Sequence, residues 1–142
     1  MKGQTRSRDA AGNFDPRKVA LAVTAISLTA IPFAYVQEEI LAQLSQTWVL
    51  VFSLAVLLSV GVAGYFLVFR HLSVSARRDP YLFFFVIFAF AAILDLLIAL
   101  TLLGYSDLMR SYTQDSEPYL QSSHGAAILL WDGIVHFALY VW

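Results

Sequence analysis

The stretch YLFFFVIFAFAAILDLLIALTLL, Tyr81–Leu103, decides the fold of this chain. It contains one ionisable residue, Asp95, and no lysine, arginine or glutamate. About 20 apolar residues are enough for a helix to cross the hydrocarbon core of a bilayer. Because lipid offers the backbone no hydrogen-bonding partners, such a segment must bond internally as a helix. The stretch therefore predicts a transmembrane helix.

Three further stretches have the same character, and none contains lysine, arginine or glutamate: Val19–Val36, Trp48–Phe69 and Gly125–Trp142. The first and the last of them are near the short end of the spanning range. Hydrophobic residues make up 59% of the 142 residues and charged residues 13%, whereas soluble domains have about 45–50% and 25%. We expect an all-α, polytopic membrane protein with four transmembrane helices in a bundle over residues 17–142. A polar tail, residues 1–16, precedes the bundle.

The basic residues predict how the chain is threaded through the membrane. Lysines and arginines concentrate in the cytoplasmic loops of membrane proteins. One side of the predicted bundle carries eight of the nine basic residues, and Arg110 alone lies on the other. The eight are Lys2, Arg6, Arg8, Arg17, Lys18, Arg70, Arg77 and Arg78. We therefore expect both termini to face the cytoplasm.

Several local signals predict the course of the first helix and of the segment that follows it. Pro16 is suited to the first position of a helix, with Asp15 as its N-cap. Pro32 is expected to kink the outer part of the helix. The segment QEEILAQLSQT, residues 37–47, has apolar residues at helical spacing. It predicts either an extension of the first helix or a short interfacial helix.

Residue size predicts how the second and third helices pack. Ser59 and Ala63 form a pair of small residues four positions apart, which permits another helix to approach closely. The cluster YLFFFVIFAF in the third helix is bulky on nearly every face. More than one face of this helix is therefore expected to meet lipid, another chain or a flat cofactor.

Three ionisable residues lie inside the predicted spans, where a charge costs at least about 2.5–3.5 kcal/mol on insertion scales. Asp132 and His136 are four residues apart, so they share one helix face. With a helical rise of about 1.5 Å per residue, Asp95 lies about 14 Å below Gly104. From Gly125, Asp132 lies about 10 Å and His136 about 17 Å deep. We expect one polar cluster between the third and fourth helices.

The predicted cluster is compatible with four roles. It could simply hold helices together. It could bind a macrocycle, because neutral histidine is a common axial ligand that needs a polar partner; the residues for this are His136, Asp132, Trp131 and Tyr140. It could move protons or ions. It could also act as an acid and base on a lipid-soluble substrate, with Asp95, Asp132 and His136 as catalytic candidates. The chain has no cysteine, and no metal site is expected.

Two short segments resemble known families. VHFALYVW is similar to the histidine-to-tryptophan stretch of bacterial light-harvesting antenna β chains, which implies a pigment ligated by His136. The resemblance covers these eight residues only. RRDPYLFFFVIF and LMRSYTQDSEPYL resemble the emopamil-binding/sigma-2 family of four-helix sterol-binding proteins, although the acidic and histidine positions do not match. No family is assigned from these segments.

We therefore expect a non-catalytic integral membrane subunit that packs against larger membrane-protein partners. Such a subunit would hold a bound lipid, or a hydrophobic cofactor such as a chlorophyll-type pigment, haem or carotenoid. The alternative is a small membrane enzyme or binding protein that acts on a sterol or lipid through the Asp/His cluster. The net charge of −1 gives no reason to expect a nucleic-acid partner.

Overall fold

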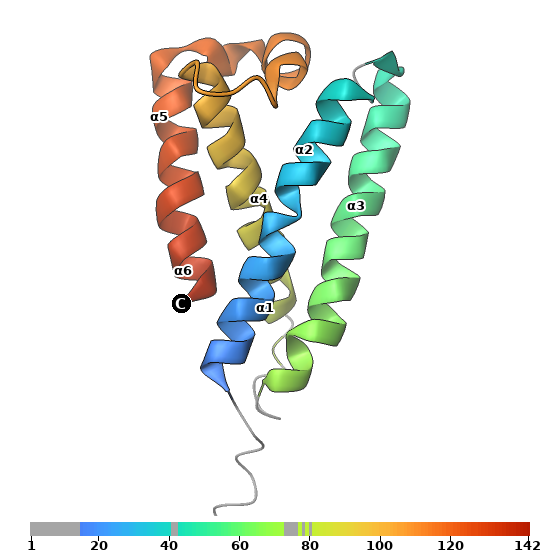
Figure 1. The fold of residues 1–142 in the computed structure, drawn as a ribbon, viewed down its shortest axis with the longest axis vertical. Helices are drawn as coiled ribbons and strands as arrows, with labels where there is room; N and C mark the ends of the chain where they lie inside the picture. Colours follow the sequence, from blue (N-terminus) through green and yellow to red (C-terminus); the bar gives the residue numbers. More distant parts are fainter. Residues whose placement is uncertain (1–14, 41–42, 73–76, 78, 80) are drawn as a thin grey trace, which may run out of the picture.

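The computed structural model describes residues 15–40, 43–72, 77, 79 and 81–142. These residues form helices and connecting segments and no strands. Four helical runs are long and apolar enough to cross a membrane: Pro16–Glu39, Thr47–His71, Phe84–Leu102 and Ser123–Val141. The all-α bundle of four membrane helices is therefore confirmed (Figure 1). Of the predicted polar tail, the part up to residue 14 lies outside the described residues.

The first crossing consists of two helices, α1 (Pro16–Leu28) and α2 (Ala30–Glu39). The Asp15 side chain caps α1 by accepting hydrogen bonds from two backbone N–H groups, as the sequence predicts. The helix is interrupted at Thr29, three residues before Pro32. Proline has no N–H group and its ring clashes with the carbonyl four residues earlier, which accounts for the interruption.

This crossing is longer than the apolar run alone predicts. It comprises 24 residues and so spans about 36 Å, because polar residues at both ends continue the helix. The alternative in which residues 37–47 extend the first helix holds as far as Glu39. The second crossing is α3 (Gln46–Leu67), followed by the short helix η2 (Phe69–His71).

Helix α4 (Tyr81–Leu102) is the centre of the molecule. It packs against α1, α2, α3 and the whole of the fourth crossing. Its inward face contributes residues that are almost completely buried, among them Phe90, Val86 and Ala89. Phe84, Phe85 and Phe88 remain exposed on the protein, on a face suited to lipid or another helix. In Figure 1, α3 and the fourth crossing lie on opposite sides of the molecule.

The fourth crossing is a continuous helical run whose middle turn is wider than an α-helix. It consists of α5 (Ser123–Trp131), the π-helical segment η6 (Asp132–His136) and α6 (Phe137–Val141). The Ser122 hydroxyl caps α5 by accepting from the Gly125 N–H group. Single π-helical turns inside α-helices occur frequently at functional sites, and this one contains Asp132 and His136.

The segment between α4 and α5 folds over one end of the bundle, the end at which α4 finishes and α5 starts (Figure 1). We call this the loop end. The segment begins at Gly104, whose φ of +79° suits a residue without a side chain. It then forms the π-helical η4 (Tyr112–Ser116) and the 3-10 helix η5 (Pro118–Gln121). Met109 within it is almost fully buried, so the segment belongs to the core. At the opposite end, the Arg77 guanidinium donates to the carbonyl oxygens of Leu72 and Arg70.

Candidate functional site

The three predicted ionisable residues line one small cavity. Asp95 comes from α4, and Asp132 and His136 come from η6. The cavity has a volume of about 160 Å³. Its remaining walls are Phe88, Ala91, Ala92 and Tyr140. We call this space the polar cleft; it places the acid of the third crossing beside the acid–histidine pair of the fourth, as the helical rise predicts.

The side chains of Asp132 and His136 contact each other along their own helix. The His136 Nδ1 atom lies 2.9 Å from the Asp132 Oδ1 atom. The side chains are 41% and 32% exposed, so the pair lies at the edge of the bundle. Ionisable groups within membrane spans almost always face the bundle interior or a water-filled cavity. The pair therefore marks a face of the fourth crossing that needs a polar environment.

Gly133 explains how η6 comes so close to α4. A Cβ atom built at Gly133 would lie 2.6 Å from the Leu96 Cβ atom and 2.7 Å from the Leu96 backbone nitrogen. Real Cβ atoms essentially never make non-bonded contacts shorter than 3.0 Å, so only glycine fits here without a shift of the helices. The close approach brings Asp132 and His136, on the same segment, to the residue that precedes Leu96, Asp95.

The two aromatic residues predicted for the site have different surroundings. The Tyr140 ring lies 5.9 Å from the His136 ring and 5.8 Å from each of the Phe85 and Phe88 rings, measured between centroids. Trp131 does not line the polar cleft, and 61% of its surface is exposed. Tyr140, not Trp131, is thus the aromatic partner of His136.

The hydroxyl groups that lie at similar depth do not join this cluster. The Ser27 Oγ atom donates to the Val23 carbonyl oxygen at 2.8 Å, and the Ser59 Oγ atom to the Ala55 carbonyl oxygen at 2.8 Å. Thr29 likewise donates to the carbonyl oxygen of Ile26. Each hydroxyl is bonded within its own crossing. These three hydroxyls therefore do not take part in the contacts of the polar cleft.

A second cavity lies on the loop side of Asp95 and was not predicted from the sequence. This outer cavity, about 200 Å³, is enclosed by α2, α3, α4 and the segment that follows α4. Four polar residues line it: Gln37, Ser53, Asp95 and Tyr112. Asp95 and Ala91 line both this cavity and the polar cleft, so the two spaces meet along one edge of α4.

Two residues that are far apart in the sequence, Glu38 and Ser111, are hydrogen-bonded beside the outer cavity. We call this contact the Ser111 clamp. The Glu38 carboxylate accepts from the Ser111 N–H group at 2.9 Å and from the Ser111 hydroxyl at 3.0 Å. Glu38 follows Gln37 and Ser111 precedes Tyr112 in the chain. The clamp therefore fixes the two cavity residues next to it. Hydrogen bonds to charged groups are among the strong ones in proteins.

The surroundings of Tyr112 disfavour the loss of its phenolic proton. Burial and then the neighbouring Glu117 carboxylate raise the pKa of Tyr112 above its ordinary value. Glu117 also accepts a hydrogen bond from the Tyr119 hydroxyl at 2.9 Å. The Tyr112 phenol, like any protonated tyrosine, can donate one hydrogen bond and accept others.

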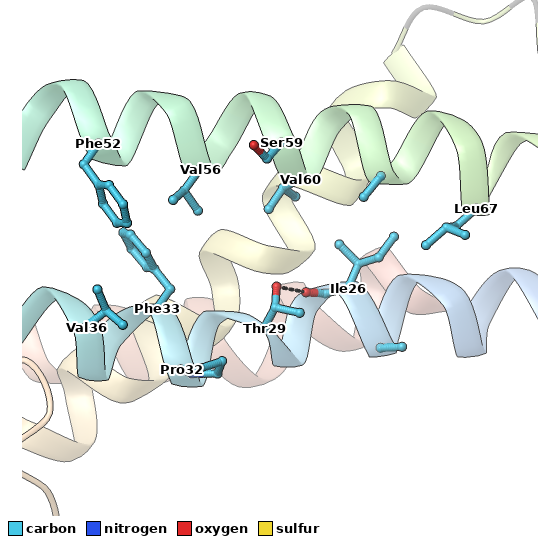
Figure 2. A pocket seen from close by; sticks show the side chains of 12 residues that line it. Ile26, Thr29, Pro32, Phe33, Val36, Phe52, Val56, Ser59, Val60 and Leu67 are labelled. Carbon is cyan, nitrogen blue, oxygen red and sulfur yellow. Dashed lines mark hydrogen bonds between the residues drawn. The ribbon is translucent and has the colours of Figure 1, made fainter.

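The largest of these spaces is an apolar groove between the first and second crossings. It has a volume of about 550 Å³ and runs along α1, α2 and α3 at the break near Thr29 (Figure 2). Its lining residues are Ala25, Ile26, Thr29, Pro32, Phe33, Val36, Phe52, Val56, Ser59, Val60, Ala63 and Leu67. Ser59 and Ala63 thus border a hollow rather than a close helix contact. The close contact of α3 is made at Gly64, which packs directly on Val86.

Phe33 and Val56 line both the apolar groove and the outer cavity. The Phe33 ring stacks on the Phe52 ring, with centroids 6.0 Å apart. On its other side it contacts the Phe90 ring at 5.9 Å. Figure 2 shows Phe33 and Phe52 pointing toward each other across the groove. The two spaces are therefore neighbours that share one aromatic boundary.

The described residues include no group of three or more histidine, aspartate or glutamate side chains placed to hold a metal ion. The polar cleft offers an imidazole and two carboxyl groups, which can exchange protons or bind a polar group. Its volume is below the range of about 300–1,000 Å³ that is usual for small-molecule sites. The apolar groove falls within that range.

Comparison with known proteins gives a family. A model of the transmembrane domain of transmembrane 6 superfamily member 2-like proteins matches residues 29–142. Transmembrane 6 superfamily member 2 from Homo sapiens is 39% identical over 120 residues, which cover 84% of this chain and 31% of that protein. The protein of that name from Rattus norvegicus is 38% identical over 118 residues, covering 82% of this chain and 30% of the relative.

The chain thus spans about a third of the length of these relatives. No solved structure matches it. The family match covers most of the chain, including three of the four crossings and all residues of the polar cleft. The relatives and the four apolar helices agree on a multi-pass integral membrane protein. The chain belongs to the transmembrane 6 superfamily member 2-like transmembrane domain family.

Proposed function

We propose that this chain is a non-catalytic transmembrane unit that holds a lipid in the apolar groove and packs against other membrane helices. The observation that carries the proposal is the groove itself, about 550 Å³ with an almost entirely apolar wall. Its two hydroxyl groups, on Thr29 and Ser59, are engaged with their own crossings. Apolar pockets of this size, usually with a few polar groups that orient the ligand, are typical binding sites for small hydrophobic molecules.

The exposed face of the fourth crossing supports the second part of the proposal. The side chains of Asp132 and His136 are 32% and 41% exposed at membrane depth, where hydrocarbon does not solvate them. Another transmembrane helix with a polar side chain would provide the missing environment. We expect both termini to lie on the cytoplasmic side in this arrangement, because the basic residues gather at that end.

The lipid part is tested by filling the groove. Ala63 lines it, whereas Leu58 on the same helix is 62% exposed. The variant Ala63→Phe should co-purify with at least tenfold less lipid than the unaltered chain, measured by extraction and mass spectrometry. Leu58→Phe is the matched control and should retain all of it. Equal lipid content in the two variants, with equal thermal stability, would refute the proposal.

A second candidate is a membrane enzyme acting on a sterol or lipid, because Asp95, Asp132 and His136 line one cavity. An acid and a base at such a site would transfer protons to and from a bound substrate. Turnover of a lipid by the purified chain, abolished by Asp95→Asn and by His136→Leu, would favour this candidate. A pigment or haem bound through His136 stays a prediction, and a visible absorption band in the purified protein is its test.

A further inference from the structure

The outer cavity and the apolar groove differ in polarity and lie side by side. The groove carries only apolar walls and self-bonded hydroxyls. The outer cavity carries an amide, a hydroxyl, a carboxyl and a phenol, from Gln37, Ser53, Asp95 and Tyr112. Their shared boundary at Phe33 and Val56 puts polar and apolar compartments within reach of one amphipathic molecule.

We propose that these two spaces form one binding site for an uncharged lipid with a hydroxyl-bearing head group. The head lies in the outer cavity and the chain lies in the apolar groove. This rests on the proposed function, in which the groove holds a lipid, and it adds the chemistry of the head group. It also assigns binding roles to Gln37, Ser53 and Tyr112.

The charge of the lining residues selects the head group. Among the described residues, no lysine, arginine or histidine lines the outer cavity, so these residues offer no counter-ion to a phosphate or a carboxylate there. The carboxyl group of Asp95 disfavours an anion further. Three neutral hydrogen-bonding groups outnumber that single carboxyl. A hydroxyl group both donates and accepts hydrogen bonds, so it can bond to an amide, a hydroxyl, a carboxyl or a phenol.

The position of the cavity fits a head group as well. Gln37 lies near the end of α2, and Tyr112 lies in the segment that covers the loop end of the bundle. The polar end of the ligand would therefore lie toward the membrane surface and its chain toward the interior. The contacts of Glu38 with Ser111 close this end and position Gln37 and Tyr112 beside the ligand.

The test uses the full chain in lipid-free detergent micelles and measures binding of four probes with the same 18-carbon acyl or alkyl chain. The probes are 1-oleoylglycerol, oleate, oleylamine and 1-oleoyl-lysophosphatidylcholine, each with a single chain. 1-Oleoylglycerol should bind at least tenfold more tightly than each of the charged or zwitterionic probes. A smaller preference, or tighter binding of any of the others, overturns the proposal.

Variants locate the head group. Gln37→Leu combined with Tyr112→Phe removes two hydrogen-bonding groups and should weaken 1-oleoylglycerol binding about tenfold. Ser53→Ala, a milder change that keeps the fold if the double variant does not, should weaken it a few-fold. The control Ser59→Ala removes a hydroxyl that is bonded to its own helix and should change nothing. If Ser53→Ala and the folded double variant both bind like the unaltered chain, the head group is not in the outer cavity.

The groove-filling variant separates this inference from the proposed function. If Ala63→Phe abolishes binding of every probe while the head-group variants have no effect, the groove holds lipid and only the head-group assignment fails. If Ala63→Phe binds all probes normally, the proposed function itself fails.

Discussion

Gly133→Ala tests the contact that holds the fourth crossing against α4. The added methyl group would lie 2.6 Å from the Leu96 Cβ atom, 2.7 Å from its nitrogen and 2.8 Å from its Cα atom. Two of these atoms belong to the backbone, so no side-chain rotation relieves the clash. The two helices must move apart instead.

The expected cost follows from this geometry. Overpacking a well-packed interior costs about 1–3 kcal/mol when side chains and backbone adjust. A backbone-to-backbone contact leaves little room for adjustment, so the upper part of that range, about 3 kcal/mol, applies here. The thermal midpoint of the purified chain should fall by about 5 °C or more. Truncating the neighbour with Leu96→Ala should not restore it, because the nitrogen, Cα and Cβ atoms of residue 96 all remain.

Tryptophan fluorescence of the detergent-solubilised chain during heating measures the effect, since Trp131 lies two residues from the substitution. Ala138→Leu is the matched control, because it adds carbon atoms to an exposed position of the same crossing and should change stability by less than about 0.5 kcal/mol. An unchanged midpoint in Gly133→Ala would show that α4 and η6 are not in direct backbone contact, and the polar cleft as described would not exist.

Three further predictions concern the polar groups. Glu38→Ala removes the acceptor of the Ser111 clamp and should speed amide hydrogen exchange of the segment around residues 109–113 about tenfold or more; unchanged exchange would mean the clamp does not hold the segment. His136→Leu leaves the Asp132 carboxyl without the imidazole that it contacts and should lower the thermal midpoint more than His136→Leu combined with Asp132→Leu does; equal or larger loss in the double variant would contradict the pairing. Because the pKa of Tyr112 is raised on folding, its stabilising effect is complete below the unfolded pKa of about 10 and is lost as the pH rises above that value. The midpoint should therefore decline above about pH 10 less steeply in Tyr112→Phe than in the unaltered chain, and parallel curves would exclude this contribution.

The four crossings could be predicted because lipid imposes a length and a composition on any helix that spans it. Their ends could not, since polar residues such as Arg17 and Glu39 continue a helix when they reach the membrane surface. The grouping of Asp95 with Asp132 and His136 was also predictable in part. The helical rise predicts that the three residues lie at similar depth. That they face one another depends on the packing of Gly133 on Leu96, which the sequence does not reveal.

The outer cavity was out of reach of sequence reasoning. Glu38 and Ser111 are 73 residues apart, and no local pattern connects a glutamate at the end of one helix with a serine in a distant loop. Ser59 and Ala63 show that a local pattern can also predict a contact that the structure does not contain. Their spacing predicted a close helix contact, but α4 packs at Gly64 on a neighbouring face, and the small residues border the groove instead. The short likenesses in the third and fourth crossings did not identify the family.

The central position of α4 has a consequence for biogenesis. The first two crossings leave the ribosome before α4 does, and α1 and α3 contact each other less extensively than each contacts α4. Until the third crossing is synthesised, they form a loosely associated hairpin. The surfaces that α4 later covers are then still uncovered. Nascent chains arrested before residue 81 should therefore depend on the insertion machinery and be cleared rapidly by membrane quality control, whereas chains arrested after α4 should persist.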